Sequence, residues 1–148
     1  GARQVADLFA GCGTFALPLA EQARVHAVEG DPAMTDALEA GWRHGARLKP
    51  VTTETRDLFR EPLMAEELAC FDAVILDPPR AGAEAQVAQL ASAGVPCIAH
   101  VSCNQVTFAR EAETLCRAGY RLTRLRIVDQ FSWSTHVELV AGFEKADA

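Results

Sequence analysis

The chain has 148 residues, of which 49% are hydrophobic and 23% charged, and its formal net charge is −6. This length predicts one domain with a full core, and the hydrophobic fraction excludes an intrinsically disordered chain. The acidic balance argues against a protein that binds nucleic acid through its overall charge, because phosphate contacts supply most of that affinity.

Neither a membrane-spanning apolar run nor a secretory leader is visible in the sequence, so we expect a cytoplasmic protein without a membrane partner. The cysteines are odd in number and form no CxxC pair and no Cys/His cluster at zinc spacing. We therefore expect no metal site and no disulfide framework. The five cysteines are Cys12, Cys70, Cys97, Cys103 and Cys116.

Strands and helices are expected to alternate along the chain. In chain order, the pattern predicts a strand over 5–9, a helix over 15–22, a strand over 25–29, a helix from 31 to about 44, strands over 50–55 and 71–77, a helix over 83–93, a strand over 95–101, a helix over 105–118, and strands over 120–129 and 137–144. Asp31 and Pro32 are typical helix-opening residues, and Gly45, Gly94 and Gly119 are placed to end helices. The tail after Phe143 is expected to pack loosely.

Strands separated by helices predict an α/β, doubly wound, Rossmann-like fold with a mostly parallel seven-stranded sheet. No helix separates the last two predicted strands, so we expect the last strand to be antiparallel. The strand over 71–77 is nearly all apolar, which is typical of a strand covered on both faces.

A glycine loop follows the first predicted strand and precedes a helix. Gly11, Gly13 and Ala16 fit the pattern G-x-G-x-x-A, in which glycines allow a tight turn and a close approach of the backbone to a ligand. Glu29 ends the second strand, at the interval expected for an acid that binds a ribose. The loop and Glu29 together predict an adenosine-containing cofactor, and a nicotinamide dinucleotide would fit this loop alone.

Asp77 ends the fourth predicted strand and is followed by Pro78, Pro79 and Arg80. Each proline stiffens the chain and removes a backbone donor, so this segment would hold the Asp77 carboxylate rigidly. Because parallel strands bind ligands at their carboxyl ends, we expect Asp77 to contact the cofactor or a base edge rather than to serve only as a turn residue.

Cys103 lies past the fifth strand, between the polar residues Ser102 and Asn104, and a helix is predicted directly after it. The positive end of that helix dipole would favour a thiolate, which makes Cys103 a candidate nucleophile. The alternative is a buried, inert thiol, which we expect for Cys70, Cys97 and Cys116. Cys12 is expected to be a small packing residue.

Glu138 lies near the start of the last strand among apolar neighbours. A partly buried carboxylate there can act as a general base, whereas an outward-facing strand residue is the simpler alternative. His136 is expected to form structural hydrogen bonds. Four arginines, Arg117, Arg121, Arg124 and Arg126, are expected to lie on a solvated helix end and strand face rather than along an RNA track.

With these segments the whole chain resembles the C-terminal catalytic domain of the RNA 5-methyluridine methyltransferases, which use S-adenosylmethionine. The resemblance rests on residues 7–15, 28–30, 77–82, 101–104 and 136–138. It implies a Rossmann-like methyltransferase fold over residues 1–148. By position, it implies Cys103 as the nucleophile and Glu138 as the base. The cofactor contacts implied in the same way are Phe9, Thr14, Glu29, Asp57 and Asp77, beside the loop residues Gly11 and Gly13.

The implied reaction transfers a methyl group to carbon 5 of a uridine in rRNA or tRNA, through a covalent cysteine adduct. Two alternatives remain: a cytosine-5 RNA methyltransferase, and a cofactor-binding module without activity. The family usually has proline after Ser-Cys-Asn, where this chain has Gln105. Family members also carry an upstream Phe-Gln segment and often an RNA-binding domain. Neither is present in this sequence, so we expect weaker activity from these residues alone.

Overall fold

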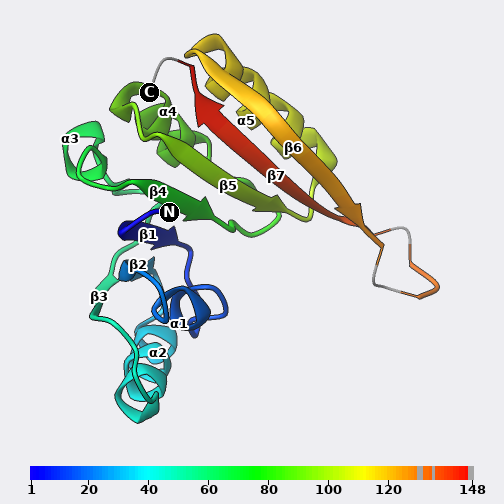
Figure 1. The fold of residues 1–148 in the computed structure, drawn as a ribbon. Coiled ribbons are helices and arrows are strands. Elements are labelled where there is room, and N and C mark those ends of the chain that lie inside the picture. Colours follow the sequence, from blue (N-terminus) through cyan, green and yellow to red (C-terminus); the bar gives the residue numbers. More distant parts are fainter. Residues whose placement is uncertain (130–131, 135, 147–148) are drawn as a thin grey trace.

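The computed structural model describes residues 1–129, 132–134 and 136–146, which form a seven-stranded sheet and five helices (Figure 1). The strands are β1 (Gln4–Leu8), β2 (Arg24–Glu29), β3 (Val51–Thr55), β4 (Ala73–Leu76), β5 (Cys97–Ser102), β6 (Tyr120–Val128) and β7 (Glu138–Lys145). The helices are α1 (Ala16–Leu19), α2 (Pro32–His44), α3 (Ala65–Leu68), α4 (Glu84–Ala93) and α5 (Gln105–Arg117).

The strands are ordered β3-β2-β1-β4-β5-β7-β6. Neighbours from β3 to β5 pair in parallel, whereas β7 pairs antiparallel with both β5 and β6. The expected mostly parallel sheet with an antiparallel last strand is therefore confirmed. The sheet order reverses between β1 and β4, which is where α/β sheets open a crevice for ligands.

Local chemistry explains where the longer helices begin and end. The Asp31 side chain accepts from the Ala33 N–H and Pro32 occupies the first turn, as expected for the start of α2. Asn104 caps α5 by accepting from the Val106 and Thr107 N–H groups. Gly94 ends α4 in the left-handed conformation, at φ 70°, as expected. Gly45 follows α2 in an extended conformation instead, at φ −72°.

Helices cover both faces of the sheet, as a doubly wound fold requires. The α4/α5 face carries the alternate residues that include Leu8, Leu76, Ile98 and Phe143, and α3, α4 and α5 bury them in the larger core. The α1/α2 face carries the residues between these, and on β2 and β3 they form a smaller core with α1 and α2 (Figure 1). Further along this face, on β4, β5 and β7, the residues are partly buried or exposed.

Several expectations about elements were wrong or too long. The helix expected over 15–22 is the four-residue α1, α3 was not expected, and the strand expected over 71–77 is the four-residue β4. Because Ala73 and Ile75 of β4 are half-buried, that strand is fully covered on only one face. Glu144 and Lys145 of the expected loose tail belong to β7; residues 147–148 lie outside the described residues.

The cysteines expected to be buried are exposed instead. Cys70 and Cys116 lie on the surface, and Cys97 begins β5 on the α1/α2 face, where partial desolvation still raises the pKa of its thiol. Cys12 is also exposed, so it is not a packing residue. Sequence patterns place a cysteine in an apolar segment, but only the packing of helices decides which strand ends are covered.

Candidate active site

The three residues singled out at strand ends lie on one face of the sheet. Asp77 follows β4, Cys103 follows β5 and Glu138 begins β7. Alternate residues of a strand share a face, so Asp77 lies on the face of Ile75 and Cys103 on that of Val101. The register pairs that fix this arrangement are Ile75 with Ala99 and Val101 with Val140. All three residues therefore belong to the α1/α2 face, near the carboxyl ends of β4 and β5.

Asp77 and Glu138 are close enough for their charges to interact. Burial raises the pKa of Asp77, the negative charge of Glu138 raises it further, and His100 lowers it. Glu138 is half-buried between the buried Leu139 and the half-buried Val137. A carboxylate in such surroundings, beside a second carboxylate, is suited to accept a proton.

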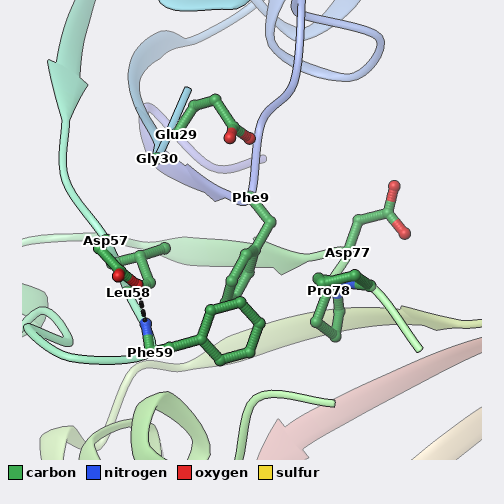
Figure 2. Close-up of a pocket in the computed structure, with 9 residues that line it drawn as sticks. Phe9, Glu29, Gly30, Asp57, Leu58, Phe59, Asp77 and Pro78 are labelled. Carbon is green, nitrogen blue, oxygen red and sulfur yellow. Dashed lines mark hydrogen bonds between the residues drawn. The ribbon is translucent and has the colours of Figure 1, made fainter. Parts of the chain in front are cut away.

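A cavity of about 420 Å³ opens beside Asp77 where the sheet order reverses. Figure 2 shows its lining, with Glu29 on one side and Asp77 on the other. It is lined by Phe9, Glu29, Gly30, Asp57, Leu58, Phe59, Asp77, Pro78 and Pro79. Phe9, Glu29, Asp57 and Asp77 are residues that the sequence resemblance assigns to the cofactor, and the fold brings them together from four different segments.

The charged residues that line this cavity favour a positively charged cofactor over a dinucleotide. Its lining contains three carboxylates, Glu29, Asp57 and Asp77, and no lysine or arginine. The Gly11 and Asp31 N–H groups donate to the Glu29 carboxylate at 2.9 and 3.0 Å, so the donors of the glycine loop face an acid. Such a site repels the pyrophosphate of a dinucleotide and suits a ligand with hydroxyl donors and positive charge.

Two aromatic side chains, Phe9 and Phe59, lie side by side in the lining of the cavity (Figure 2). The rings of Phe9 and Phe59 have centroids 5.3 Å apart at an interplanar angle of 57°. Phe9 holds a positive φ of 61°, rare for a residue with a Cβ, and the Asp57 carboxylate accepts from the Phe59 N–H at 3.0 Å. Sequence reasoning missed Phe59. An aromatic residue just after a strand, at the carboxyl edge of a parallel sheet, is the signal that points to it.

The remaining loop residues expected at the cofactor, Gly11, Gly13 and Thr14, do not line the cavity. Gly13 has φ 97°, and a Cβ there would come within 2.9 Å of Leu38 Cγ. Its lack of a side chain therefore allows the loop to pack against α2. Gly11 has φ 56°, and its N–H group contacts Glu29.

Cys103 opens into a second cavity, of about 240 Å³. This cavity is lined by Arg80, Cys103, Asn104, Gln105, Val106, His136 and Val137. The Asn104 Nδ2 group donates to the Arg80 carbonyl at 3.0 Å, which ties the loop after Asp77 to the loop of Cys103. Gln105 takes the first position of α5, so this helix starts directly after the cysteine loop without the usual proline. His136 is exposed, and its N–H group donates to Ser134 Oγ.

A buried acid on α5, Glu111, contacts the loop after Asp77 and strand β5. Glu111 Oε1 accepts from the Ala83 N–H, and Glu111 Oε2 lies 3.0 Å from His100 Nε2, without the alignment of a hydrogen bond. Both side chains are almost fully buried. Gly82 has φ 77°, and a Cβ there would come within 2.5 Å of Glu111 Oε1. The loop after Asp77 is thus fitted to this carboxylate.

Asp7 is a further buried acid, in β1 on the α1/α2 face. Its side chain is fully buried, and neither carboxylate oxygen has a hydrogen-bond partner among the described residues. Burial raises the pKa of Asp7 to about 7. The Ala16 N–H, which is near the carboxylate but not aligned for a hydrogen bond, lowers it, and the charges of Asp77 and Glu29 raise it by smaller amounts. Sequence reasoning treated Asp7 only as part of the glycine-loop motif.

The described part of the chain contains no group of three or more His, Cys, Asp or Glu residues arranged to hold a metal ion. Within the same residues, no helix is long and apolar enough to cross a membrane.

The chain is similar to curated proteins that are longer than the chain itself. The chain is 60% identical over 144 residues to an uncharacterized RNA methyltransferase of Rhizobium meliloti, covering 97% of this chain and 35% of the relative. It is 46% identical over 144 residues to the 23S rRNA (uracil(1939)-C(5))-methyltransferase RlmD of Pseudomonas entomophila, covering 95% and 31%. The chain therefore spans about a third of the length of the curated relatives that it matches.

Among solved structures, the tRNA (uracil-54, C5)-methyltransferase of Pyrococcus abyssi in complex with S-adenosyl-L-homocysteine superposes with a TM-score of 0.83 at 28% identity, covering 97% of this chain and 34% of that one. The magnesium protoporphyrin IX methyltransferase of Synechocystis superposes with a TM-score of 0.73 at 17% identity, covering 96% and 69%, which shows a shared fold. The family model for tRNA (uracil-5-)-methyltransferase matches residues 47–145, more than half of the chain. The chain therefore belongs to the tRNA (uracil-5-)-methyltransferase family.

Proposed function

We propose that residues 1–148 form a catalytic domain that methylates carbon 5 of a uridine in RNA, with S-adenosylmethionine as methyl donor and Cys103 as covalent nucleophile. The observation that carries this proposal is the shared sheet face of Asp77, Cys103 and Glu138 beside an acidic cavity. Family membership and the RNA methyltransferases among the relatives support the same reaction.

The residues of the acidic cavity fit S-adenosylmethionine. Its ribose hydroxyls are donors suited to Glu29, its adenine matches the aromatic surface of Phe9 and Phe59, and its positive charge suits Asp57 and Asp77. Bound there, S-adenosylmethionine supplies an electrophilic methyl group. The cavity for the base is the separate one around Cys103, lined by Arg80 and Asn104.

The chain's own residues account for the other steps. Carbon 5 of uracil is a weak nucleophile, so the Cys103 thiolate adds to carbon 6 and concentrates electron density on carbon 5. Carbon 5 then takes up the methyl group, and the sulfur–methyl bond of the donor breaks to leave S-adenosylhomocysteine. Glu138 accepts the proton from carbon 5, and the C–S bond to Cys103 breaks as the ring double bond reforms. A thiol and a carboxylate on one sheet face supply both roles.

The cofactor part is tested by calorimetric titration of this chain with S-adenosylhomocysteine and with NAD. We expect binding of S-adenosylhomocysteine and none of NAD, because the cavity holds three carboxylates and no lysine or arginine. Binding of NAD without S-adenosylhomocysteine would overturn the cofactor assignment.

The nucleophile is tested with RNA that carries 5-fluorouridine, because fluorine cannot be removed as a proton and the adduct therefore persists. We expect a covalent adduct at Cys103 and none in Cys103→Ser, whose affinity for S-adenosylhomocysteine stays within about twofold. Cys97→Ser on the same sheet face is the matched control and should form the adduct normally. An adduct at another cysteine would refute the nucleophile, and an adduct only with 5-fluorocytidine RNA would change the substrate base to cytosine.

A further inference from the structure

The edge strand β6 is basic, although the chain as a whole is acidic. Its nine residues include Arg121, Arg124 and Arg126 and no acid, whereas the net charge of the chain is −6. Arg121 lies 3.8 Å from Glu144, and nearby Arg117 pairs with Glu113 at 2.5 Å. Arg124 and Arg126 are exposed, and within the described residues neither forms an ion pair. These two arginines are therefore available to an anionic partner.

The strand register places both arginines on the face of the candidate active site. Arg124 pairs with Gly142 and Arg126 with Val140, and on β7 these residues share the α1/α2 face with Glu138. A Cβ built on Gly142 would lie 3.6 Å from Arg124 Cβ, which agrees with this orientation. Because strands rise about 3.4 Å per residue, Arg126 lies only about 7 Å along the sheet from the pair formed by Val128 and Glu138.

The turn between β6 and β7 adds an aromatic side chain. Trp133 is fully exposed and holds a positive φ of 65°. Residues 132–134 lie beyond the end of the sheet (Figure 1). The arm that returns from the turn carries His136 and Val137, which line the Cys103 cavity. Trp133 is a large aromatic residue left wholly in solvent, three residues before His136 of the Cys103 cavity, and such an exposed ring is a surface that stacks nucleobases.

We propose that Arg124, Arg126 and Trp133, the hairpin surface, bind single-stranded RNA next to the target nucleotide. The inference rests on the proposed function for its substrate class. The two arginines contact phosphates, and Trp133 stacks an unpaired base that flanks the one held at Cys103. The sequence predicted a solvated helix end and strand face for the four arginines rather than an RNA track. All four are exposed, but Arg117 and Arg121 have acidic partners, whereas Arg124 and Arg126 have none among the described residues.

The test measures binding of a fluorescent single-stranded oligoribonucleotide to this chain by anisotropy, over a series of salt concentrations. The matched control for Arg124→Gln/Arg126→Gln is Arg43→Gln/Arg47→Gln, which removes two exposed positive charges at the far end of α2. We expect the hairpin variant to lower the slope of log affinity against log salt by about 1.4, since each phosphate contact on a single strand contributes about 0.7. The control should keep the slope of the unaltered chain.

Trp133→Ala should weaken binding about fivefold or more without changing the salt slope, and Trp133→Phe should retain most of the affinity, because stacking needs a flat ring rather than charge.

Circular dichroism melting verifies that every variant is folded. Equal affinity and slope in hairpin and control variants would refute the proposal, as would undetectable RNA binding by the unaltered chain. Self-association that these substitutions abolish, seen by light scattering, would refute it by showing a protein interface instead. Titration with S-adenosylhomocysteine tests the proposed function separately. If the chain fails to bind the cofactor but still binds RNA through the hairpin surface, only the cofactor site is rejected.

Discussion

At the scale of single residues, surroundings decide which titratable groups can take part in chemistry. Of the five cysteines, all of them in the described part of the chain, only Cys103 is half-buried, and it lines a cavity together with Arg80, His136 and Val137. Glu138 differs from Glu144, the other acid of β7, because it lies close enough to Asp77 for their charges to interact. Residue type made Cys103 and Glu138 candidates, and the fold places both on one face of the sheet.

The proposed role of Glu138 as the base predicts the step at which its loss stops the reaction. Glu138→Gln keeps the shape of the side chain but cannot accept the carbon 5 proton. In a methylation reaction with RNA, a protein–RNA adduct that already carries the methyl group should accumulate on denaturing gels. Glu144→Gln, an exposed acid on the same face of β7, should turn over normally. Release of methylated RNA at the normal rate by Glu138→Gln would exclude this residue as the base.

Asp7 predicts a pH dependence of stability. Folding raises its pKa from 3.8 to about 7, so the folded chain binds this proton more tightly than the unfolded chain. The stability contributed by the neutral carboxyl group is therefore full below about pH 4 and is lost as the pH rises through about 7. The shift corresponds to a loss on the order of 4 kcal/mol at most.

Asp7→Asn removes the ionisation while keeping the size of the side chain. Urea unfolding at pH 5 and pH 8 should show that the free energy of unfolding falls less with pH in Asp7→Asn than in the unaltered chain. Asp36→Asn, on the exposed face of α2, should follow the unaltered chain. The same pH dependence in both variants would mean that Asp7 does not carry this proton.

At the scale of elements, α5 acts as a support for the two loops of the site. Its N-terminus is capped by Asn104, which also donates to Arg80, and its interior Glu111 accepts from Ala83 and faces His100. One helix thus fixes the loop after Asp77 and the loop of Cys103 relative to each other. Preorganisation of this kind lowers the cost of aligning reacting atoms.

Removal of the Glu111 carboxylate should therefore be costly. Glu111→Ala leaves the buried Ala83 N–H without an acceptor and His100 without its partner, which predicts a loss of about 2–4 kcal/mol in the free energy of unfolding. Glu113→Ala removes an exposed carboxylate two residues away and should cost less than about 1 kcal/mol. Chemical denaturation measures both, and equal losses would show that Glu111 is not a structural junction.

Element boundaries followed the sequence where caps are local and departed from it where packing decides. The start of α2 and the end of α4 lie where Asp31, Pro32 and Gly94 predict them, because these residues act within one turn. The helix expected over 15–22 shrinks to α1, and β4 is shorter than its apolar run. In these segments, contacts with distant elements override the local pattern.

At the scale of the molecule, two hydrophobic cores lie on opposite faces of one sheet. Phe143 belongs to the core between the sheet and helices α4 and α5, and Leu38 belongs to the core between the sheet and helices α1 and α2. The pairing of β1 with both β2 and β4 joins the two halves of the sheet. Because the shared sheet loses its backbone hydrogen bonds if either half opens, we expect one cooperative unfolding transition.

Phe143→Ala and Leu38→Ala test this coupling. Each removes a fully buried side chain, and the expected losses are about 3–5 and 2–5 kcal/mol in the free energy of unfolding. Each variant should lower the midpoint of the same single thermal transition, followed by circular dichroism and by tryptophan fluorescence. Met34→Ala, an exposed residue of α2, is the control. Two separate transitions in either variant would show that the halves unfold independently.

The sequence by itself determined the class of fold, the antiparallel last strand, and the strand ends that carry Asp77 and Cys103, because periodicity and turn chemistry act over a few residues. Only the tertiary structure decided that Phe59 joins Phe9 in the acidic cavity and that Arg124 and Arg126 share a face with Glu138. The tertiary structure also decided that Cys97 is exposed and that Glu111 faces His100. These features depend on strand order, register and helix coverage, which arise from contacts between residues far apart in the chain.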